Sequence, residues 1–132
     1  MGLVFLDSDI CIHFLNGKDK AIVEKFKKYT PDEIKIAAIV KAELLFGVQN
    51  SHRRKENHLK LSQFLEPFEI VPFDSHAAEV YDEIRFELKN NGNIIGPNNL
   101  ILASTVLTNE GTLATRNLGE FNRLESLKIE AW

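Results

Sequence analysis

Short apolar runs recur along the chain, separated by longer segments of mixed polarity. The first run, at residues 3–6, is continuous and suits a strand that is buried on both faces, as in a parallel sheet. Comparable runs lie at residues 33–40, 69–73, 112–115 and 127–132. The pattern therefore predicts four or five short strands, with helical segments between them.

Apolar residues between these runs repeat every three or four positions, which is the spacing of helices that bury one face. This spacing predicts helices at residues 9–17, 22–29, 41–48, 53–68, 75–88 and 97–107. Asn16 and Gly17 are typical of a helix C-terminus, and Asp74 or Ser75 is a suitable N-cap. Pro97 suits the first residue of the last helix.

The alternation of strands and helices predicts an α/β three-layer domain, in which a mostly parallel sheet of four or five strands carries helices on both faces. The chain is long enough for one domain, residues 1–132. Sites in such sheets lie beyond the carboxyl ends of the strands. This rule directs attention to Asp7, Glu43, Asn99 and residues 115–120.

The composition excludes several classes of protein. A formal net charge of −3 argues against broad electrostatic capture of nucleic acid, although it permits a local basic patch. Cys11 is the only cysteine, which excludes an intramolecular disulfide and a cysteine-based zinc site. No apolar run approaches the ~18 residues of a membrane helix, and the N-terminus lacks a signal-peptide pattern. We therefore expect a cytoplasmic protein with no membrane partner.

Two groups of basic residues are candidates for nucleic-acid contacts. One consists of Lys25, Lys27 and Lys28, and the other of residues 53–55. Both groups lie beside acidic residues on predicted helix faces, and this arrangement favours an ordinary solvated surface.

Asp7 and Glu43 are acids in apolar surroundings. Asp7 directly follows the first predicted strand, where it is equally suited to cap the next helix or to bind a metal ion. Glu43 lies within residues 42–46, which have the composition of a buried segment. Because glutamate is rarely buried unless it is paired, a functional role is the favoured interpretation of Glu43.

Residues 115–120 add further polar candidates. Arg116 suits a phosphate contact, although a solvated charge is its commoner use, while Thr115 or Asn117 suits a helix cap and Glu120 an exposed acid. The sequence contains no glycine-rich phosphate motif and no nucleophile elbow. The remaining chemistry is that of oxygen ligands, which favours Mg²⁺ or Mn²⁺.

Asn98 and Asn99 occupy the first turn of the last predicted helix. A helix start favours negative charge, because its backbone N–H groups are unpaired and its dipole is positive there. The neutral Asn99 therefore belongs either to an ordinary cap or to a functional site that lacks one charge.

Four motifs occur in order and at fitting distances: FLDSDICIHFL, AAIVKAELLFGV, IGPNNLILAS and LATRNLGEF. Together they resemble the PIN-domain ribonucleases, specifically the VapC toxins of bacterial VapBC toxin–antitoxin systems. The resemblance spans essentially the whole chain and implies a single PIN-like domain. It also implies an endoribonuclease that depends on Mg²⁺ or Mn²⁺ and cleaves RNA, which is tRNA for several members of the family.

The same resemblance implies the partners of the protein. VapC toxins usually form homodimers and are held inactive by a VapB antitoxin. Operator DNA is bound through the antitoxin complex.

The resemblance also implies the site residues. Asp7 matches the first acid of the family, Glu43 the second, and Glu120 the acid of the last motif, beside Asn117. Asn99 stands where the third acid belongs. The expected catalytic and metal-ligand positions are therefore Asp7, Glu43, Asn99 and Glu120.

Other positions depart from the family pattern or play a lesser part. Asp9 stands where Asn is common and adds an acid near Asp7, and Asn117 and Arg116 are secondary candidates. Asn98 is the expected helix cap. Because Asn99 carries no charge, we expect the present form to be inactive or weakened. Asn99 belongs either to a naturally degenerate toxin or to an inactivated variant, and the intact remainder of the site favours the second.

Two other functions stay open at this point. The stretch VFLDSD resembles the DxD opening of haloacid-dehalogenase-type phosphatases, with Asp7 as nucleophile and Asp9 as acid. The later lysine and paired acids of that chemistry are not evident, and Glu43 would have no role. The fold also suits a non-catalytic module that binds RNA or an antitoxin.

Overall fold

The structure, a computed structural model, describes residues 2–132. Its five strands form one sheet in the order β3-β2-β1-β4-β5, and every neighbouring pair is parallel. The strands are β1 (Val4–Leu6), β2 (Ile34–Ala37), β3 (Glu69–Val71), β4 (Thr112–Thr115) and β5 (Lys128–Ala131). The predicted parallel sheet and its five strands are confirmed.

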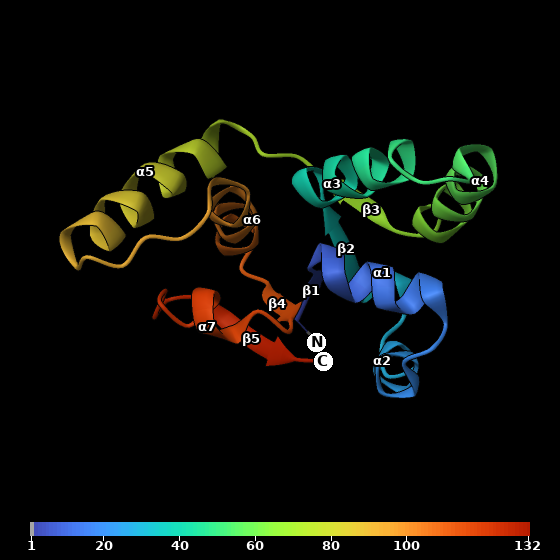
Figure 1. Cartoon of the computed structure of the whole chain (residues 1–132). Helices are drawn as coiled ribbons and strands as arrows, with labels where there is room; N and C mark the ends of the chain where they lie inside the picture. The colour runs from blue at the N-terminus through green and yellow to red at the C-terminus, as the bar shows by residue number, and fades with distance from the viewer. Residues whose placement is uncertain (1) are drawn as a thin grey trace.

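Helices connect the successive strands. They are α1 (Ser8–Asn16), α2 (Lys20–Phe26), α3 (Ala38–Gln49), α4 (Arg54–Leu65), α5 (Ser75–Asn90), α6 (Pro97–Thr108) and α7 (Leu118–Phe121), with a 3₁₀ turn at Pro31–Glu33. Figure 1 shows α5 packed beside α6 at one end of the molecule and α1 to α4 at the other, with the strands between them. None of the helices within residues 2–132 is long and apolar enough to cross a bilayer.

Local chemistry sets most helix ends as predicted. Asp74 caps α5 by accepting a hydrogen bond from the Ala77 N–H at 2.9 Å. Gly17 ends α1 with a φ of 67°, a left-handed conformation that glycine adopts without strain. Pro97 is the first residue of α6.

Two boundary predictions are wrong. The apolar run at residues 33–40 is a strand only as far as Ala37, and α3 begins at Ala38. A short apolar run does not distinguish a buried strand from the start of a buried helix. Asn98 is not the cap of α6, because Gly96 occupies that position without a side-chain hydrogen bond.

The central strand β1 is completely buried, since Val4, Phe5 and Leu6 are each at most 1% exposed. Asp7 follows it directly, and its N–H donates to the Ala114 carbonyl at 3.0 Å. This bond extends the ladder between β1 and β4 by one residue. Asp7 is therefore held at the carboxyl edge of the sheet, where the fold class predicts a site.

A methyl group added at Gly111 tests the packing beneath β1. Its Cβ would lie 2.7 Å from two ring carbons of Phe5, which is completely buried. We expect Gly111→Ala to lower the free energy of unfolding by about 1–3 kcal/mol, because the core must shift to admit the methyl. Chemical denaturation monitored by circular dichroism measures the change.

Gly47 provides the matched control. It lies inside α3, and an added Cβ meets no atom within 4 Å. Gly47→Ala should raise the stability by up to about 1 kcal/mol through helix propensity alone. Equal stability of the two variants would contradict the packing described around Phe5.

Candidate active site

Asp7 is an almost completely buried carboxylate, with 6% of its surface exposed. It is the N-cap of α1, and its Oδ1 accepts the Ser8 N–H at 2.8 Å. Its Oδ2 accepts the Thr115 hydroxyl at 2.7 Å. The helix-cap interpretation of Asp7 is therefore confirmed, but the cap uses only one of its two oxygens.

The charge on Asp7 is poorly compensated. Burial raises the pKa of Asp7, the hydrogen bond from Thr115 opposes that rise, and the negative charges of Asp9 and Glu43 add to it. None of the ion pairs within residues 2–132 involves any of these three acids. A cation at this edge of the sheet would relieve both the repulsion and the desolvation of the carboxylates.

Glu120, at the start of α7, is in the opposite situation. The Gly96 N–H donates to its Oε1, and the Asn117 side-chain amide donates to its Oε2 at 3.3 Å. The pKa of Glu120 is lowered by the bond from Gly96 first and by hydrogen bonds from Asn99 and Asn117 in addition. Here three donors stabilise the charged form without any cation.

Thr115 joins these two acids. It is completely buried at the end of β4. Its hydroxyl donates to Asp7 and accepts the Asn117 N–H at 3.0 Å. A continuous series of hydrogen bonds therefore runs from Asp7 through Thr115 and Asn117 to Glu120 and the Gly96 N–H. It links the carboxyl ends of β1 and β4 to the first turns of α6 and α7.

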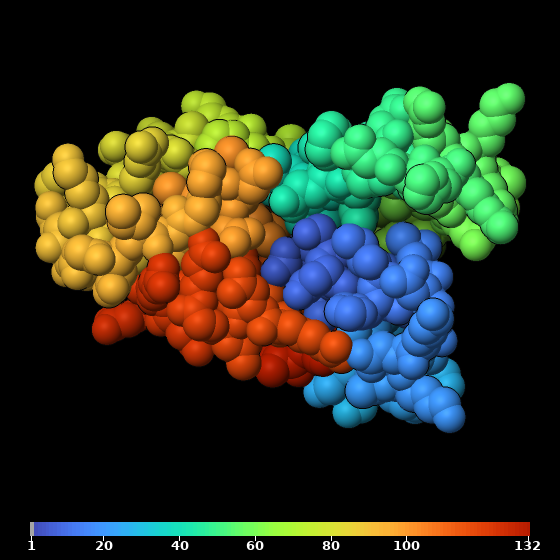
Figure 2. Space-filling model, viewed as in Figure 1, coloured from blue at the N-terminus to red at the C-terminus, as the bar shows by residue number. Residues whose placement is uncertain are grey.

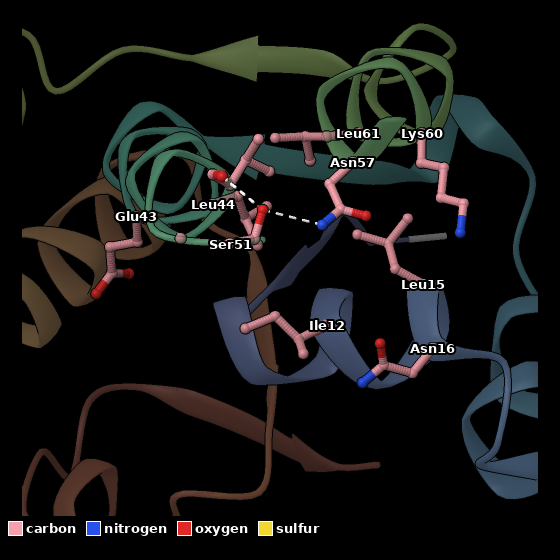
Figure 3. Close-up of a pocket in the computed structure, with 11 residues that line it drawn as sticks. Ile12, Leu15, Asn16, Glu43, Leu44, Ser51, Asn57, Lys60 and Leu61 are labelled. Atoms are coloured by element: carbon pink, nitrogen blue, oxygen red, sulfur yellow. Dashed lines mark hydrogen bonds between the residues drawn. The ribbon is translucent and has the colours of Figure 1, made fainter. Parts of the chain in front are cut away.

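Glu43 lies in α3 and is half-buried. Its carboxylate is turned away from Asn57 and Lys60, which lie across a cavity of about 280 Å³ between α1, α3 and α4 (Figure 3). The prediction that its neighbours are all buried is wrong, since Ala42 is exposed and Phe46 is 68% exposed. Glu43 is connected to the site by its charge, which acts on Asp7.

Arg116 is oriented away from the acids and makes other contacts. Its Nε donates to the Trp132 carbonyl at 3.0 Å, and its Nη2 donates to Asp19 at 2.5 Å. Asp19 is the N-cap of α2. Arg116 therefore ties the C-terminal residue and α2 to the end of β4, and neither of the two uses predicted for it describes these contacts.

The candidate acids do not form a closed metal cage. Within residues 2–132, no three His, Cys, Asp or Glu side chains are grouped so that they could hold a metal ion. Asp9 and Glu43 act on Asp7 through their charges, whereas Asn99 acts on the separate acid Glu120. The donors are nevertheless all oxygens, which suit Mg²⁺ or Mn²⁺. The uncompensated charge at Asp7 also suits a divalent cation.

The comparison with known families decides what kind of domain carries this arrangement. Residues 4–127 match the PIN domain. The chain is a VapC-type PIN domain. It is 35% identical to Ribonuclease VapC2 of Rickettsia felis, and the match covers 98% of each chain. It is 30% identical to the tRNA(fMet)-specific endonuclease VapC of Salmonella typhimurium, over 96% of each chain.

A solved structure supports the same assignment. The PIN domain superposes on a chain of VapBC2 from Rickettsia felis, crystallised with a DNA fragment from their promoter, with a TM-score of 0.90 and 34% identity. The match covers 98% of both chains. The resemblance inferred from the four motifs is therefore confirmed, as is the PIN-like fold.

Sequence analysis of this PIN domain missed two groups of the site. Thr115 was interpreted only as a possible helix cap, although a threonine that ends a buried strand beside an acidic sheet edge is a signal of a polar contact. The Gly96 N–H is a backbone donor at the cap of α6, and no side-chain pattern reveals it.

The raised pKa of Asp7 has a testable consequence for stability. A carboxyl group whose pKa is raised in the folded state contributes stability below its ordinary pKa of 3.8, and that contribution is lost as the pH rises through the folded-state value. In EDTA, Asp7→Asn should therefore be more stable than the parent PIN domain at neutral pH. The difference should shrink on acidification.

Urea denaturation of both proteins between pH 4 and 8 measures this difference. Asp32→Asn is the control, because Asp32 is an exposed carboxylate in the 3₁₀ turn. A parent protein that is more stable than Asp7→Asn at neutral pH would show that the hydrogen bonds of Asp7 outweigh its desolvation.

Proposed function

We propose that this PIN domain is an endoribonuclease toxin of the VapC type, which depends on Mg²⁺ or Mn²⁺ and is weakened in its present form by Asn99. The observation that carries the proposal is the hydrogen-bonded series from Asp7 to Glu120 and Gly96, beside the uncompensated acids Asp9 and Glu43, with Asn99 acting on the pKa of Glu120. The relatives named as ribonucleases support the reaction class.

The proposed substrate is RNA, and tRNA is the class to test first. The support for tRNA is the 30% identical relative, which is named a tRNA(fMet)-specific endonuclease. The particular tRNA belongs to the name of that relative, and we propose neither a particular tRNA nor a particular cleaved bond for this chain.

The residues proposed to hold the divalent ion are Asp7, Glu43, Glu120 and the position of Asn99. A bound divalent ion in such a site orients a phosphate, activates water and stabilises charge on the leaving oxygen. Thr115 acts on this site by holding Asp7 in place, since its hydroxyl donates to the inner oxygen of that carboxylate. Asp9 adds negative charge beside Asp7 and so favours the cation.

Asn99 accounts for the weakened form that we propose. Its amide is one of three donors that satisfy Glu120, so that this acid is stable as a carboxylate without a metal. An aspartate at the same position would remove a donor and place a second negative charge beside Glu120. Glu120 and the aspartate at position 99 would then both need a cation to offset their repulsion. With Asn99 at this position, Glu120 has no such need.

The alternatives are less well supported. The match of residues 4–127 to the PIN domain and the relatives named as ribonucleases do not support a DxD-type phosphatase. A non-catalytic binding module would be expected to gain no activity when the missing acid is restored.

A VapB-type antitoxin and a second copy of the chain are the proposed protein partners, and operator DNA is proposed to bind only through the antitoxin complex. The complex of VapBC2 with promoter DNA supports this assembly by analogy. The exposed apolar side chains of this chain also favour protein partners: Ile12, Phe46, Leu59, Phe73, Phe86 and Ile94.

Restoring the acid tests the function. Asn99→Asp should cleave total tRNA in Mg²⁺ or Mn²⁺ at a rate on the order of a hundredfold or more above the parent, because metal-supplied charge stabilisation is worth several kcal/mol. It should arrest growth when expressed. In EDTA it should melt at a lower temperature than the parent, because it adds a like charge beside Glu120.

The control combines Asn99→Asp with Glu43→Gln, which should abolish the restored cleavage and leave the fold intact. Gel analysis of total tRNA with and without metal compares the three proteins. Equal cleavage by the parent and Asn99→Asp would show that residue 99 is not a ligand position.

Assembly is a separate prediction. At micromolar concentration the chain should sediment as a homodimer, and the antitoxin from its natural operon should copurify with it and suppress the cleavage by Asn99→Asp. A monomer that binds no antitoxin would count against the proposed partners. The cleavage assay would still decide the ribonuclease proposal separately.

A further inference from the structure

Positive charge is concentrated in the two residues before α4 and in the first half of this helix. Residues 52–60 contain four Lys or Arg residues and one acid, a formal charge of +3 in a chain whose net charge is −3. We call its exposed basic side chains the α4 basic surface: His52, Arg53, Arg54, Lys55, His58 and Lys60. In Figure 2 the green side chains of this region project from one end of the molecule.

Most of this charge is unpaired. Glu56 lies 3.6 Å from Arg53, and both side chains are largely exposed, so that the pair is weak. Arg54 and Lys55 form no ion pair with any side chain of residues 2–132. Together with His58 they line a hollow against Val48 and Gln49 at the end of α3.

The stability of α4 does not explain these residues. Arg53 is the N-cap and forms no side-chain hydrogen bond, and Arg54 and Lys55 are the first two helical residues. Positive charge at a helix N-terminus opposes the helix dipole, by roughly 0.3–1 kcal/mol for each charge. By contrast, α1, α2 and α5 begin after the aspartate caps Asp7, Asp19 and Asp74.

The other basic group predicted from the sequence differs in this respect. Lys27 lies 3.1 Å from Glu24, and Lys25 lies 3.9 Å from Glu130, so that two of its three charges have partners. Both groups are largely exposed, as predicted for a solvated surface, but they differ in how much of their charge is paired.

The α4 basic surface is also connected to the candidate active site. Glu43 precedes the last residue of α3 by six positions, which is about 9 Å of helix. The cavity between α1, α3 and α4 has Glu43 at one end and Lys60 at the other (Figure 3). A nucleic-acid backbone carries one negative charge per nucleotide, so that a stem bound at the acids would present further phosphates to this surface.

We propose that the α4 basic surface binds the phosphate backbone of the RNA substrate at a distance from the cleaved bond. The inference rests on the proposed ribonuclease function and adds to it a substrate-binding surface. Arg54 and Lys55 provide the central contacts, because they are unpaired and line the same hollow. Phosphate contacts position a nucleic acid without reading its sequence, so this surface contributes affinity and not choice of cleavage site.

The test removes two charges from each basic group in turn. The dissociation constant for total tRNA is measured by filter binding at several salt concentrations, for the parent, for Arg54→Ala with Lys55→Ala, and for Lys27→Ala with Lys28→Ala. We expect the α4 pair to weaken binding on the order of tenfold and to reduce the slope of log K against log salt by roughly one for each contact. The variant Lys27→Ala with Lys28→Ala, just after α2, should bind tRNA as the parent does.

Two further variants separate charge from folding. Arg54→Lys with Lys55→Arg keeps both charges and should retain the affinity and the salt slope of the parent. The α4 alanine pair should melt no lower than the parent, because it removes charges that oppose the helix dipole. Equal tRNA affinity of the two alanine double variants would overturn the proposal. So would an Arg54→Ala, Lys55→Ala variant that no longer binds the antitoxin but binds tRNA as the parent does.

Cleavage measurements distinguish failure of this inference from failure of the ribonuclease proposal. In the Asn99→Asp background, the α4 alanine pair should raise KM and leave kcat unchanged, because its contacts lie away from the reacting atoms. A fall in kcat at unchanged KM would contradict the assigned role. If Asn99→Asp itself fails to cleave RNA, the ribonuclease proposal fails, whereas the binding comparison still decides whether the surface holds RNA.

Discussion

The hydrogen bond between Thr115 and Asp7 is the contact on which the candidate site depends. It is 2.7 Å long, buried, and joins residues 108 positions apart. It exists because β1 and β4 are parallel neighbours with Leu6 beside Ala114, so that Asp7, which follows β1, and Thr115, the last residue of β4, lie at the same edge. A carboxylate buried there without a cation needs such a donor, because an unpaired buried charge is strongly unfavourable.

The two acids at the ends of this hydrogen-bonded series are stabilised in opposite ways. Burial and the charges of Asp9 and Glu43 raise the pKa of Asp7, whereas the donors around Glu120 lower its pKa. Asn99 contributes to this asymmetry, because it is among the groups that lower the pKa of Glu120. The unfavourable electrostatics of the acidic edge are therefore concentrated at Asp7.

Sequence patterns predicted the features of the fold that depend on local chemistry. Gly17 and Asp74 act within one turn of their own helix, and the continuous apolar run at residues 3–6 corresponds to the completely buried strand β1. The boundary at Ala37 could not be predicted, because the apolar residues that follow it suit a buried strand and a buried helix equally. The contacts of Arg116 and Thr115 could not be predicted from the sequence either, because strand register brings together residues that are remote in sequence.

Resemblance to a family predicted which acids belong to the site, but it did not show how they are connected or what else the surface does. That distinction matters most for α4. A residue that stabilises the fold needs no further explanation, whereas Arg54 and Lys55 lie at the end of a helix where positive charge is unfavourable. Residues that oppose local stability and have no partner in the folded chain point to a ligand outside it. If the proposed ribonuclease function holds, these unpaired cations near the candidate acids are where the proposal places the rest of the RNA.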